Sequence, residues 1–394
     1  MADRGDAARP RRGFEVAEFE GRTARAQSAM RAAGMDAILL TNEPEVRYFT
    51  GFHTQFWESP TRPWFVLLPL SGKPVTIIPE IGRAGMEATW IDDIRCWPAP
   101  RPADDGVSLL TQALADLPRR FGRLGVPMGH ESLVRMPLAD FLKILGDLEG
   151  LEPVDAAPLL HRLRFVKSPA EIAKIRHVCE ITSGAFEALP ALMRTGMSEL
   201  EICRAFRIDL LQRGADNSPY LIAGSGPGGY DSIIMGPTDR ILDEGDVLII
   251  DTGTTYDGYF CDFDRNFAFQ RAEEDLQRAY RTVYEATEAG FRAARPGATT
   301  SDVWSAMWQV MERGGALGNS VGRLGHGLGM ELTEWPSNTP DDGTLLEPGA
   351  VLTLEPGMEF APGRQMVHEE NIVVTEDGAE WLTRRAASEI PVVD

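Results

Sequence analysis

Acidic side chains recur along two stretches of the sequence that alternate in the manner of paired strands. In the first, residues 247–269, a β-branched apolar run reaches Asp251, turns near Asp257 and returns through Asp262 and Asp264. A four-residue loop would set Asp251 directly opposite Asp262, whereas a two-residue turn would set it opposite Asp264. In either register, two carboxylates whose Cβ atoms lie about 5 Å apart repel each other unless a cation lies between them.

The second acidic stretch lies downstream. Residues 350–360 and 366–376 are predicted strands joined by a short Pro-Gly turn, which makes Glu355 face Glu369. Between the two acidic stretches, His326 has a glycine on each side, so the backbone can come close to whatever the imidazole touches. Three carboxylates and one imidazole suit a divalent transition metal, and four carboxylates suit two metals bridged by shared acids.

Each of these residues alone is more often structural, since a single Asp after a strand usually forms a turn or caps a helix. Taken in order, however, the set resembles the metal site of the M24 metallopeptidase family, whose fold is called pita-bread. All five ligand types stand in the family's order, and the first two keep its spacing of eleven residues. The set comprises Asp251, Asp262, His326, Glu355 and Glu369.

The resemblance implies a role for each member of this set. Asp251 would chelate one metal, His326 and Glu355 would chelate the other, and Asp262 and Glu369 would bridge them. Glu355 and His326 are the expected catalytic residues, with Glu355 handling the proton of the attacking water. Carboxylate-rich ligation does not select the cation, so the two divalent ions could be Mn, Zn, Co or Fe.

The sequence departs from the family around the substrate. Peptidase members carry further histidines in the pocket, and here Ile234 or Met235, Gly322 and Thr333 occupy those positions. Val367 stands where some aminopeptidases P have arginine. The metal ligands are therefore complete, whereas the donors that would hold a peptide are missing, and an amide oxygen needs such donors.

Three functions follow from this pattern. The first is a dinuclear-metal hydrolase, similar to Xaa-Pro peptidases, that cleaves an amide or related C–N bond of a small molecule or short peptide. The alternative is a non-peptidase relative resembling ectoine hydrolase, creatinase or dimethylsulfoniopropionate lyase, acting on a small zwitterion. An inactive binding module is the third, and retention of all five ligands argues against it.

Aromatic residues concentrate at 52–65, FHTQFWESPTRPWF, which either packs at an interface or reaches into the pocket of a neighbouring subunit. Related enzymes usually work as dimers, so the resemblance implies a homodimer. Tryptophans could also form a wall for a small cation. The candidate substrate-binding residues are Phe56, Trp57, Met235, Thr333 and Trp335.

At 394 residues, the chain is long enough for two domains. The segment 25–52 resembles the start of the creatinase/prolidase amino-terminal domain. Ser168-Pro169 followed by Glu171 is a strong helix start, and it matches the beginning of the family's catalytic domain. We expect an α/β (α+β) architecture with a flexible tail at 1–13, a creatinase-like α/β domain at 14–164 and a pita-bread catalytic domain at 165–394.

Periodicity predicts the elements that carry these residues. The glycine-rich stretch GSGPGG at 224–229 leads into another strand, so it is a strand connection rather than a phosphate loop. Predicted helices cover 19–33, 107–121, 137–148, 198–214, 272–294 and 300–314, besides the one that starts at Ser168. Predicted strands of the first half cover 36–41, 63–70, 73–79 and 123–128.

Composition limits the partners. An apolar fraction of 43% and a charged fraction of 25% are typical of a soluble globular protein, and no run approaches a membrane span. The net charge of −20 argues against nucleic acid as a partner. The four cysteines form no CxxC pair, which fits a reducing compartment, so we expect a cytoplasmic location.

Overall fold

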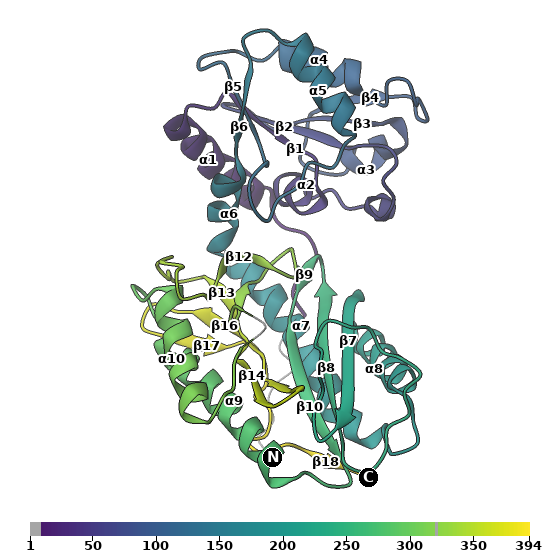
Figure 1. Cartoon of the computed structure of the whole chain (residues 1–394). Coiled ribbons are helices and arrows are strands. Elements are labelled where there is room, and N and C mark those ends of the chain that lie inside the picture. The colour runs from purple at the N-terminus through teal and green to yellow at the C-terminus, as the bar shows by residue number, and fades with distance from the viewer. Residues whose placement is uncertain (1–8, 320–321) are drawn as a thin grey trace. The chain divides into compact units, whose positions relative to one another are not determined.

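The computed structural model describes residues 9–319 and 322–394, which form two compact units (Figure 1). One unit is Arg11–Arg164, and the other is Phe165–Asp394 together with Arg9 and Pro10. Of the tail expected at 1–13, residues 1–8 lie outside the described part. The Tyr256 hydroxyl accepts a hydrogen bond from Arg9 Nε at 3.1 Å and donates one to the Pro10 carbonyl at 2.8 Å.

The amino-terminal unit is built on a six-stranded mixed sheet with strand order β4-β3-β2-β1-β5-β6. The hairpin expected at 63–79 is present, because β2 and β3 pair antiparallel. The strands are β1 (Ala37–Leu40), β2 (Phe65–Pro69), β3 (Val75–Pro79), β4 (Asp93–Trp97), β5 (Arg123–Val126) and β6 (Glu152–Asp155). The helices are α1 (Val16–Ala33), α2 (Glu43–Thr50), η1 (Gln55–Glu58), η2 (Glu80–Gly82), α3 (Arg83–Glu87), α4 (Val107–Ala115), α5 (Leu138–Asp147) and α6 (Ala157–Phe165).

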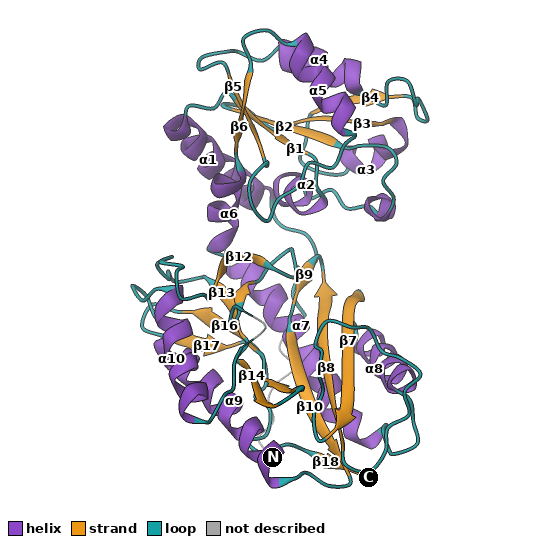
Figure 2. Ribbon diagram, in the orientation of Figure 1, coloured by secondary structure: helices purple, strands orange, loops and turns teal. Residues whose placement is uncertain are grey.

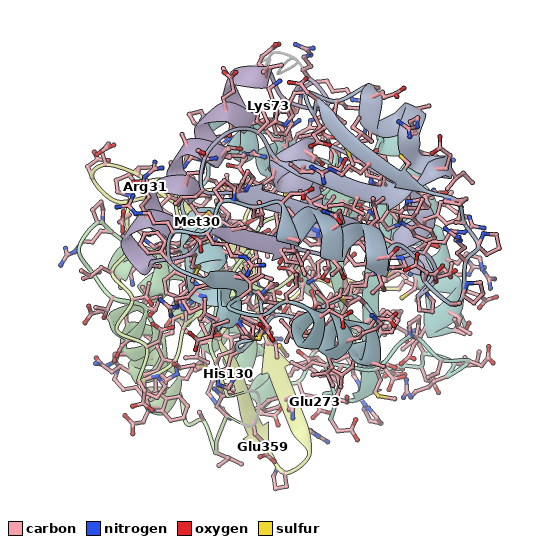
Figure 3. The ribbon with its side chains drawn as sticks, turned by 90° about the horizontal axis from the view of Figure 1, so that it is seen from above. Met30, Arg31, Lys73, His130, Glu273 and Glu359 are labelled. Carbon is pink, nitrogen blue, oxygen red and sulfur yellow. The ribbon has the colours of Figure 1, made fainter. Side chains whose placement is uncertain are left out.

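Helix α1 illustrates how the apolar pattern orients these helices. Met30 is fully buried, whereas the next residue, Arg31, is exposed and donates a hydrogen bond to the Leu70 carbonyl at 3.1 Å (Figure 3). The helix ends at Gly34, whose φ of +68° is the left-handed conformation that glycine adopts at low cost. The helix expected at 19–33 is therefore confirmed, with one additional turn at its start.

The second unit contains two main sheets and a separate ribbon of two strands (Figure 2). The first sheet has the order β18-β10-β8-β7, with β9 also pairing with β8, and the second has the order β12-β11-β13-β16-β17. The first sheet comprises β7 (Asn217–Pro227), β8 (Asp246–Tyr256), β9 (Tyr259–Phe260), β10 (Phe263–Phe269) and β18 (Val392–Val393). The others are β11 (His326–Gly327), β12 (Glu334–Ser337), β13 (Val351–Leu354), β14 (Gly357–Ala361), β15 (Arg364–Val367), β16 (Glu370–Val374) and β17 (Ala379–Trp381).

Helices flank these sheets. Helices α7 and α8 pack on each other and on the first sheet, while α9 contacts β13 and the β14–β15 ribbon and packs against α10 (Figure 1). Ser168 caps α7 and forms the reciprocal hydrogen bonds of a capping box with Glu171, as the sequence predicts. The helices are α7 (Pro169–Ala188), η3 (Leu189–Ala191), α8 (Glu199–Arg213), α9 (Glu274–Ala293) and α10 (Thr300–Arg313).

The core of this unit leads directly to the acidic residues. Val247 and Ile249 of β8 belong to the buried cluster that also contains residues of α9, β13 and β16. Because side chains alternate along a strand, Asp251 points to the same face as these two residues. The face is therefore apolar at the start of β8 and acidic towards its end.

The glycine-rich segment 224–229 begins within β7 and leads to β8 without an intervening helix, so the strand-connection interpretation is confirmed. Among residues 9–319 and 322–394, every helix is too short or too polar to cross a lipid bilayer.

Candidate metal centre

The first acidic hairpin closes with a two-residue turn. Asp257 and Gly258 have φ values of +49° and +80°, and the two positive values are those of a type I′ turn, which matches the twist of an antiparallel pair. The resulting register pairs Asp251 with Asp264. The alternative in which Asp262 lies directly opposite Asp251 is therefore wrong, because Asp262 lies one step nearer the turn on the same face.

Asp262 is held by a side chain of the second sheet. Its backbone N–H donates to Asn371 Oδ1 at 3.0 Å, and its carbonyl accepts a hydrogen bond from Asn371 Nδ2. Asn371 lies on β16, two residues after Glu369. This pair of bonds fastens the first hairpin to the strand that carries another acid.

The second acidic hairpin has the expected register. Leu354 pairs with Glu370 and Gly357 pairs with Val367, which puts Glu355 opposite Glu369 between them. The side chain of Glu370 points away from this pair, and it forms ion pairs with Arg265 at 3.1 Å and Arg385 at 2.9 Å. The position of Glu370 is therefore consistent with its absence from the predicted ligands.

His326 lies on β11 between two glycines that its neighbours require. A Cβ on Gly325 would lie 2.2 Å from the Thr353 carbonyl oxygen, and a Cβ on Gly327 would lie 2.4 Å from that of Trp335. The Thr353 hydroxyl accepts a hydrogen bond from the His326 backbone N–H at 3.1 Å. The close backbone approach expected from the glycines is thus present, and it positions the imidazole.

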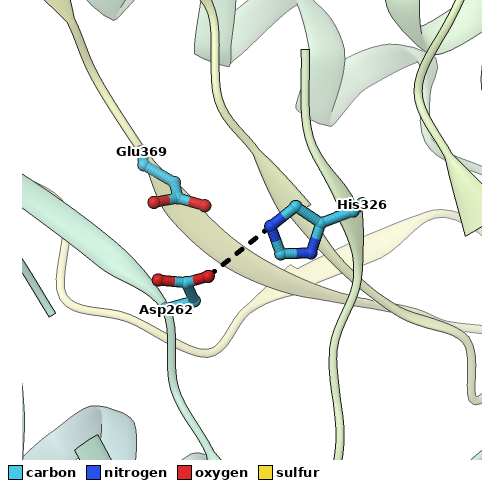
Figure 4. Close-up of side chains that lie close together, drawn as sticks. All are labelled: Asp262, His326 and Glu369. Carbon is cyan, nitrogen blue, oxygen red and sulfur yellow. Dashed lines mark ion pairs between the residues drawn. The ribbon is translucent and has the colours of Figure 1, made fainter. Parts of the chain in front are cut away.

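All five predicted ligands line one cavity of about 440 Å³. They reach it from the first hairpin, from β11 and from the second hairpin. One ligand atom each from Asp262, His326 and Glu369 lies within 4.8 Å of the others, and Figure 4 shows these side chains pointing towards one another. The cavity is lined by Tyr220, Ile233, Ile234, Asp251, Asp262, Arg323, His326, Leu332, Thr333, Glu355 and Glu369.

Burial raises the pKa of every carboxyl group that lines this cavity. It raises the pKa of Asp251 to about 7 and, together with the charge of Asp251, raises the pKa of Glu355 to about 8. Burial and neighbouring carboxylates also raise the pKa values of Asp262 and Glu369 well above their usual range. Such a concentration of desolvated carboxylates is unfavourable unless cations neutralise it.

The histidine presents a lone pair to this acidic group. Burial, and then the charge of Arg323, lower the pKa of His326 to about 4, so the ring is neutral. Its Nδ1 lies 2.8 Å from the Gly327 carbonyl, which can only accept, so Nδ1 carries the hydrogen. Nε2 is then an acceptor aimed at Asp262 Oδ2 3.5 Å away. This tautomer and orientation are those of a metal-binding histidine.

Unsatisfied oxygens complete the fit to a cation. Asp251 Oδ1, Asp262 Oδ1 and Glu369 Oε1 are buried and have no hydrogen-bond partner within residues 9–319 and 322–394. Buried polar atoms without a partner are rare in native proteins, and each requires an explanation. Carboxylate oxygens and one imidazole nitrogen around a shared space suit divalent transition metals.

The predicted substrate residues are distributed unevenly. Thr333 lines the cavity, but Met235 is 60% exposed and does not, and its neighbours Ile233 and Ile234 line the wall instead. Trp335 packs edge-on against Phe165 at 5.1 Å, next to the core cluster, so its ring does not reach the cavity.

Phe56 and Trp57 lie in the amino-terminal unit, on η1. Arginine side chains cover both rings, with Arg62 lying 5.2 Å from the ring centroid of Phe56 and Arg135 lying 5.1 Å from that of Trp57. Their approach to a substrate remains a prediction from the sequence.

Two polar residues of the cavity were missed in the sequence. Tyr220 lies on β7, next to β8, and lines the cavity together with Asp251. Arg323 lies three residues before His326, and its Nη2 donates to Thr333 Oγ1 at 3.2 Å. The position of Arg323 in GRLGHGLG was an available signal, whereas that of Tyr220 depends on a strand order that sequence alone does not give.

Comparison with known proteins agrees with this geometry. Residues 173–377 match the description Metallopeptidase family M24, and residues 22–166 match the Creatinase/Prolidase N-terminal domain. The chain belongs to metallopeptidase family M24. Among its M24 relatives is the probable dipeptidase PepE of Mycobacterium tuberculosis, which is 30% identical over 381 residues, or 93% of this chain and 95% of that protein.

Two further similarities concern the same family. The Xaa-Pro dipeptidase of Pyrococcus furiosus is 28% identical over 263 residues, covering 65% of this chain and 73% of that protein. The crystal structure of dipeptidase PepE from Mycobacterium ulcerans superposes with a TM-score of 0.84 at 28% identity, covering 97% of this chain and 99% of that one. This M24 chain is therefore a hydrolase of the metallopeptidase type, with a creatinase-like domain followed by a pita-bread domain. The family and fold predicted from the sequence are confirmed.

Proposed function

We propose that this chain is a metal-dependent dipeptidase that hydrolyses the C–N bond of small dipeptides, Xaa-Pro dipeptides among them. Asp251, Asp262, His326, Glu355 and Glu369 would hold two divalent cations. The observation that carries it is the convergence of these five side chains on one cavity whose carboxylate oxygens lack other partners.

Cations bound there would lower the pKa of a bound water towards neutrality and polarise the scissile carbonyl. Glu355 lines the cavity, and its ionised carboxylate can accept the proton of the attacking water and return it to the leaving nitrogen. The hydroxyl group adds to the carbonyl carbon first, and the C–N bond breaks when the nitrogen receives the proton, so that one water molecule is consumed for each bond cleaved. A neutral His326 holds its position through the Gly327 carbonyl throughout.

The substrate-binding side of the cavity contains donors that the sequence did not reveal. Tyr220 remains protonated, since burial and the neighbouring Asp251 raise its pKa. The guanidinium group of Arg323 lies beside Thr333, and its planar donors suit the carboxylate of a dipeptide. These two residues supply donors in a cavity that lacks the family's additional histidines. That observation, together with relatives described as dipeptidases, favours peptide cleavage over the zwitterion alternative.

The remaining features of the proposal come from the sequence. We propose a homodimer in the cytoplasm that uses Mn, Zn, Co or Fe and binds neither nucleic acid nor membranes. A net charge of −20 supports the exclusion of nucleic acid.

The test is a substrate screen with defined metal content. Protein stripped of metal and reconstituted with Mn²⁺, Zn²⁺, Co²⁺ or Fe²⁺ is assayed with Xaa-Pro and other dipeptides, tripeptides, creatine, ectoine and sulfonium compounds. We expect up to two bound ions per chain and release of free amino acids from dipeptides. Turnover of a zwitterion with none of the dipeptides cleaved would instead support the non-peptidase relative, and absence of bound metal would support an inactive module.

A further inference from the structure

Another aspartate of the first hairpin, Asp264, has no role in the proposed metal centre. Asp264 is 1% exposed, and it is directly opposite Asp251 in the strand register, on the face that also presents Asp262. Directly opposed Cβ atoms lie about 5 Å apart, whereas diagonal neighbours lie about 7–8 Å apart. In backbone terms, Asp264 is thus a closer neighbour of Asp251 than Asp262 is.

Only one of the two carboxylate oxygens of Asp264 has a hydrogen-bond partner among the described residues. Oδ1 accepts a hydrogen bond from Asn266 Nδ2 at 3.3 Å and lies 3.9 Å from His368 Nδ1. Oδ2 is buried and has no hydrogen-bond partner among the described residues, and the same is true of Asp251 Oδ1. Two facing carboxylates with a partnerless oxygen each indicate that a positive charge belongs near them.

The nearby arginines are directed elsewhere. Arg265 Nη2 pairs with Glu370 Oε2 at 3.1 Å, and its Nη1 donates to the backbone carbonyls of Asp264 and Glu369. Arg385 pairs with Glu370 at 2.9 Å and with Glu288 at 3.0 Å. Glu370 and Glu288 therefore offset these two cations, and the Asp264 carboxylate has no ion pair of its own with either arginine.

Asp264 is nevertheless outside the cavity lining. The lining includes Asp251 and Asp262 but not Asp264, and Asn266, the next residue on this face, hydrogen-bonds to Tyr230 and to the Val367 carbonyl in the interior. The Asp264 carboxylate thus lies beside Asp251 but outside the cavity, next to residues of the core. Groups that surround metal ligands in this way orient those ligands and contribute to the electrostatic field at the metal.

We propose that Asp264 is a positioning residue of the metal centre: its buried carboxylate faces Asp251 and strengthens the binding of the cation that Asp251 holds, without becoming a ligand itself. This inference rests on the proposed function. Two divalent cations would balance the four ligand carboxylates, and the partnerless Oδ2 of Asp264 is a further buried carboxylate oxygen beside Asp251.

The experiment compares Asp264→Asn with wild type in Mn²⁺ titrations followed by calorimetry and by elemental analysis of bound metal. Asparagine preserves the shape of aspartate and removes its charge. We expect the same number of bound ions, with the weaker site binding Mn²⁺ about 10 to 100-fold less tightly, as is typical when such an outer partner is lost. The melting temperature of metal-free Asp264→Asn should equal or exceed that of metal-free wild type, because a buried carboxylate that forms no ion pair with Arg265 or Arg385 is removed.

Asp257→Asn is the matched control, because it makes the same chemical change in the turn of the same hairpin, where the carboxylate pairs with Lys174. It should lower the melting temperature and leave Mn²⁺ affinity within about twofold of wild type. Unchanged Mn²⁺ affinity in Asp264→Asn would overturn the inference, and so would loss of one bound ion or a lowered melting temperature of the metal-free protein. If wild type itself bound no metal, the proposed function would fail first, so the two failures are distinguishable.

Discussion

The Nε2 atom of His326 lies 3.5 Å from Oδ2 of Asp262, and Nε2 presents a lone pair to this carboxyl group. The Gly327 carbonyl fixes the hydrogen of the ring on Nδ1, and burial keeps the ring neutral. An imidazole lone pair and a carboxylate oxygen at this separation suit a divalent cation between them. This relationship supports the proposed metal binding on grounds of geometry, besides the family.

Replacing Glu369 with glutamine should abolish activity without unfolding the protein. The carboxylate faces the cavity and has a partnerless oxygen, so its loss weakens metal binding more than packing. We expect kcat/KM to fall by at least about 100-fold, as for a group acting directly at the reacting centre. Steady-state kinetics, bound-metal analysis and a thermal melt measure the three effects.

Glu370→Gln is the matched comparison, since the adjacent carboxylate pairs with Arg265 and Arg385 instead. Breaking a buried ion pair on one side costs about 3–5 kcal/mol, so this variant should lose stability and still bind metal. The assignment of Glu369, and not Glu370, as a ligand would be contradicted if Glu369→Gln stayed active. It would also be contradicted if Glu370→Gln kept normal stability but failed to bind metal.

Metal binding should release protons and become tighter as the pH rises. Without metal, the pKa of Asp251 is about 7 and that of Glu355 about 8, so both carboxyls are partly protonated at neutral pH and must lose protons to become ligands. Apparent Mn²⁺ affinity should therefore rise between pH 6 and 9. Calorimetry in buffers of different ionisation enthalpy measures the protons released, and a pH-independent affinity would refute this.

Asp251 and Glu355 also determine how the stability of the metal-free protein changes with pH. Because their folded pKa values exceed the unfolded values of about 4, metal-free protein loses stability as the pH rises from about 4 through 8. His326 and His368 have pKa values lowered to about 4, and their effect has the opposite sign between about pH 6.5 and 4. Melts above pH 6.5 isolate the carboxyl groups, and the gap between metal-bound and metal-free melting temperatures should widen there.

Arg323→Met should weaken binding of substrates that carry a free carboxylate. A hydrogen bond to a charged group contributes about 1.5–3 kcal/mol, so KM for a dipeptide should rise on the order of 10 to 100-fold. The corresponding dipeptide amide provides the control, because it lacks the negative charge and should be affected little. Equal losses for the acid and the amide would show that Arg323 acts through the structure of the cavity and not through the carboxylate.

Gly325→Ala should remove the imidazole from the site. The glycine has a φ of +122°, and an added Cβ would lie 2.2 Å from the Thr353 carbonyl oxygen, so the backbone before His326 must shift. We expect destabilisation on the order of 2–4 kcal/mol and weaker metal binding. Gly343→Ala is the control, since nothing lies within 4 Å of its added Cβ. Normal metal affinity in Gly325→Ala would show that the segment tolerates the shift.

Much of this protein was readable from its amino-acid order. The capping box at Ser168, the glycine that ends α1 and the opposition of Glu355 and Glu369 follow from local rules of helix ends, turns and strand alternation. These rules act over a few residues, so the residues themselves determine them.

The sequence by itself determined the family, the two-domain order and the identities of five candidate ligands, because residue types and their order along the chain carry that information. Only the tertiary structure decided that Asp264 rather than Asp262 faces Asp251, that Tyr220 and Arg323 enter the cavity, and that Met235 and Trp335 do not. The physical reason is that turn type and strand order bring together residues far apart in the chain, and they depend on the packing of the whole unit.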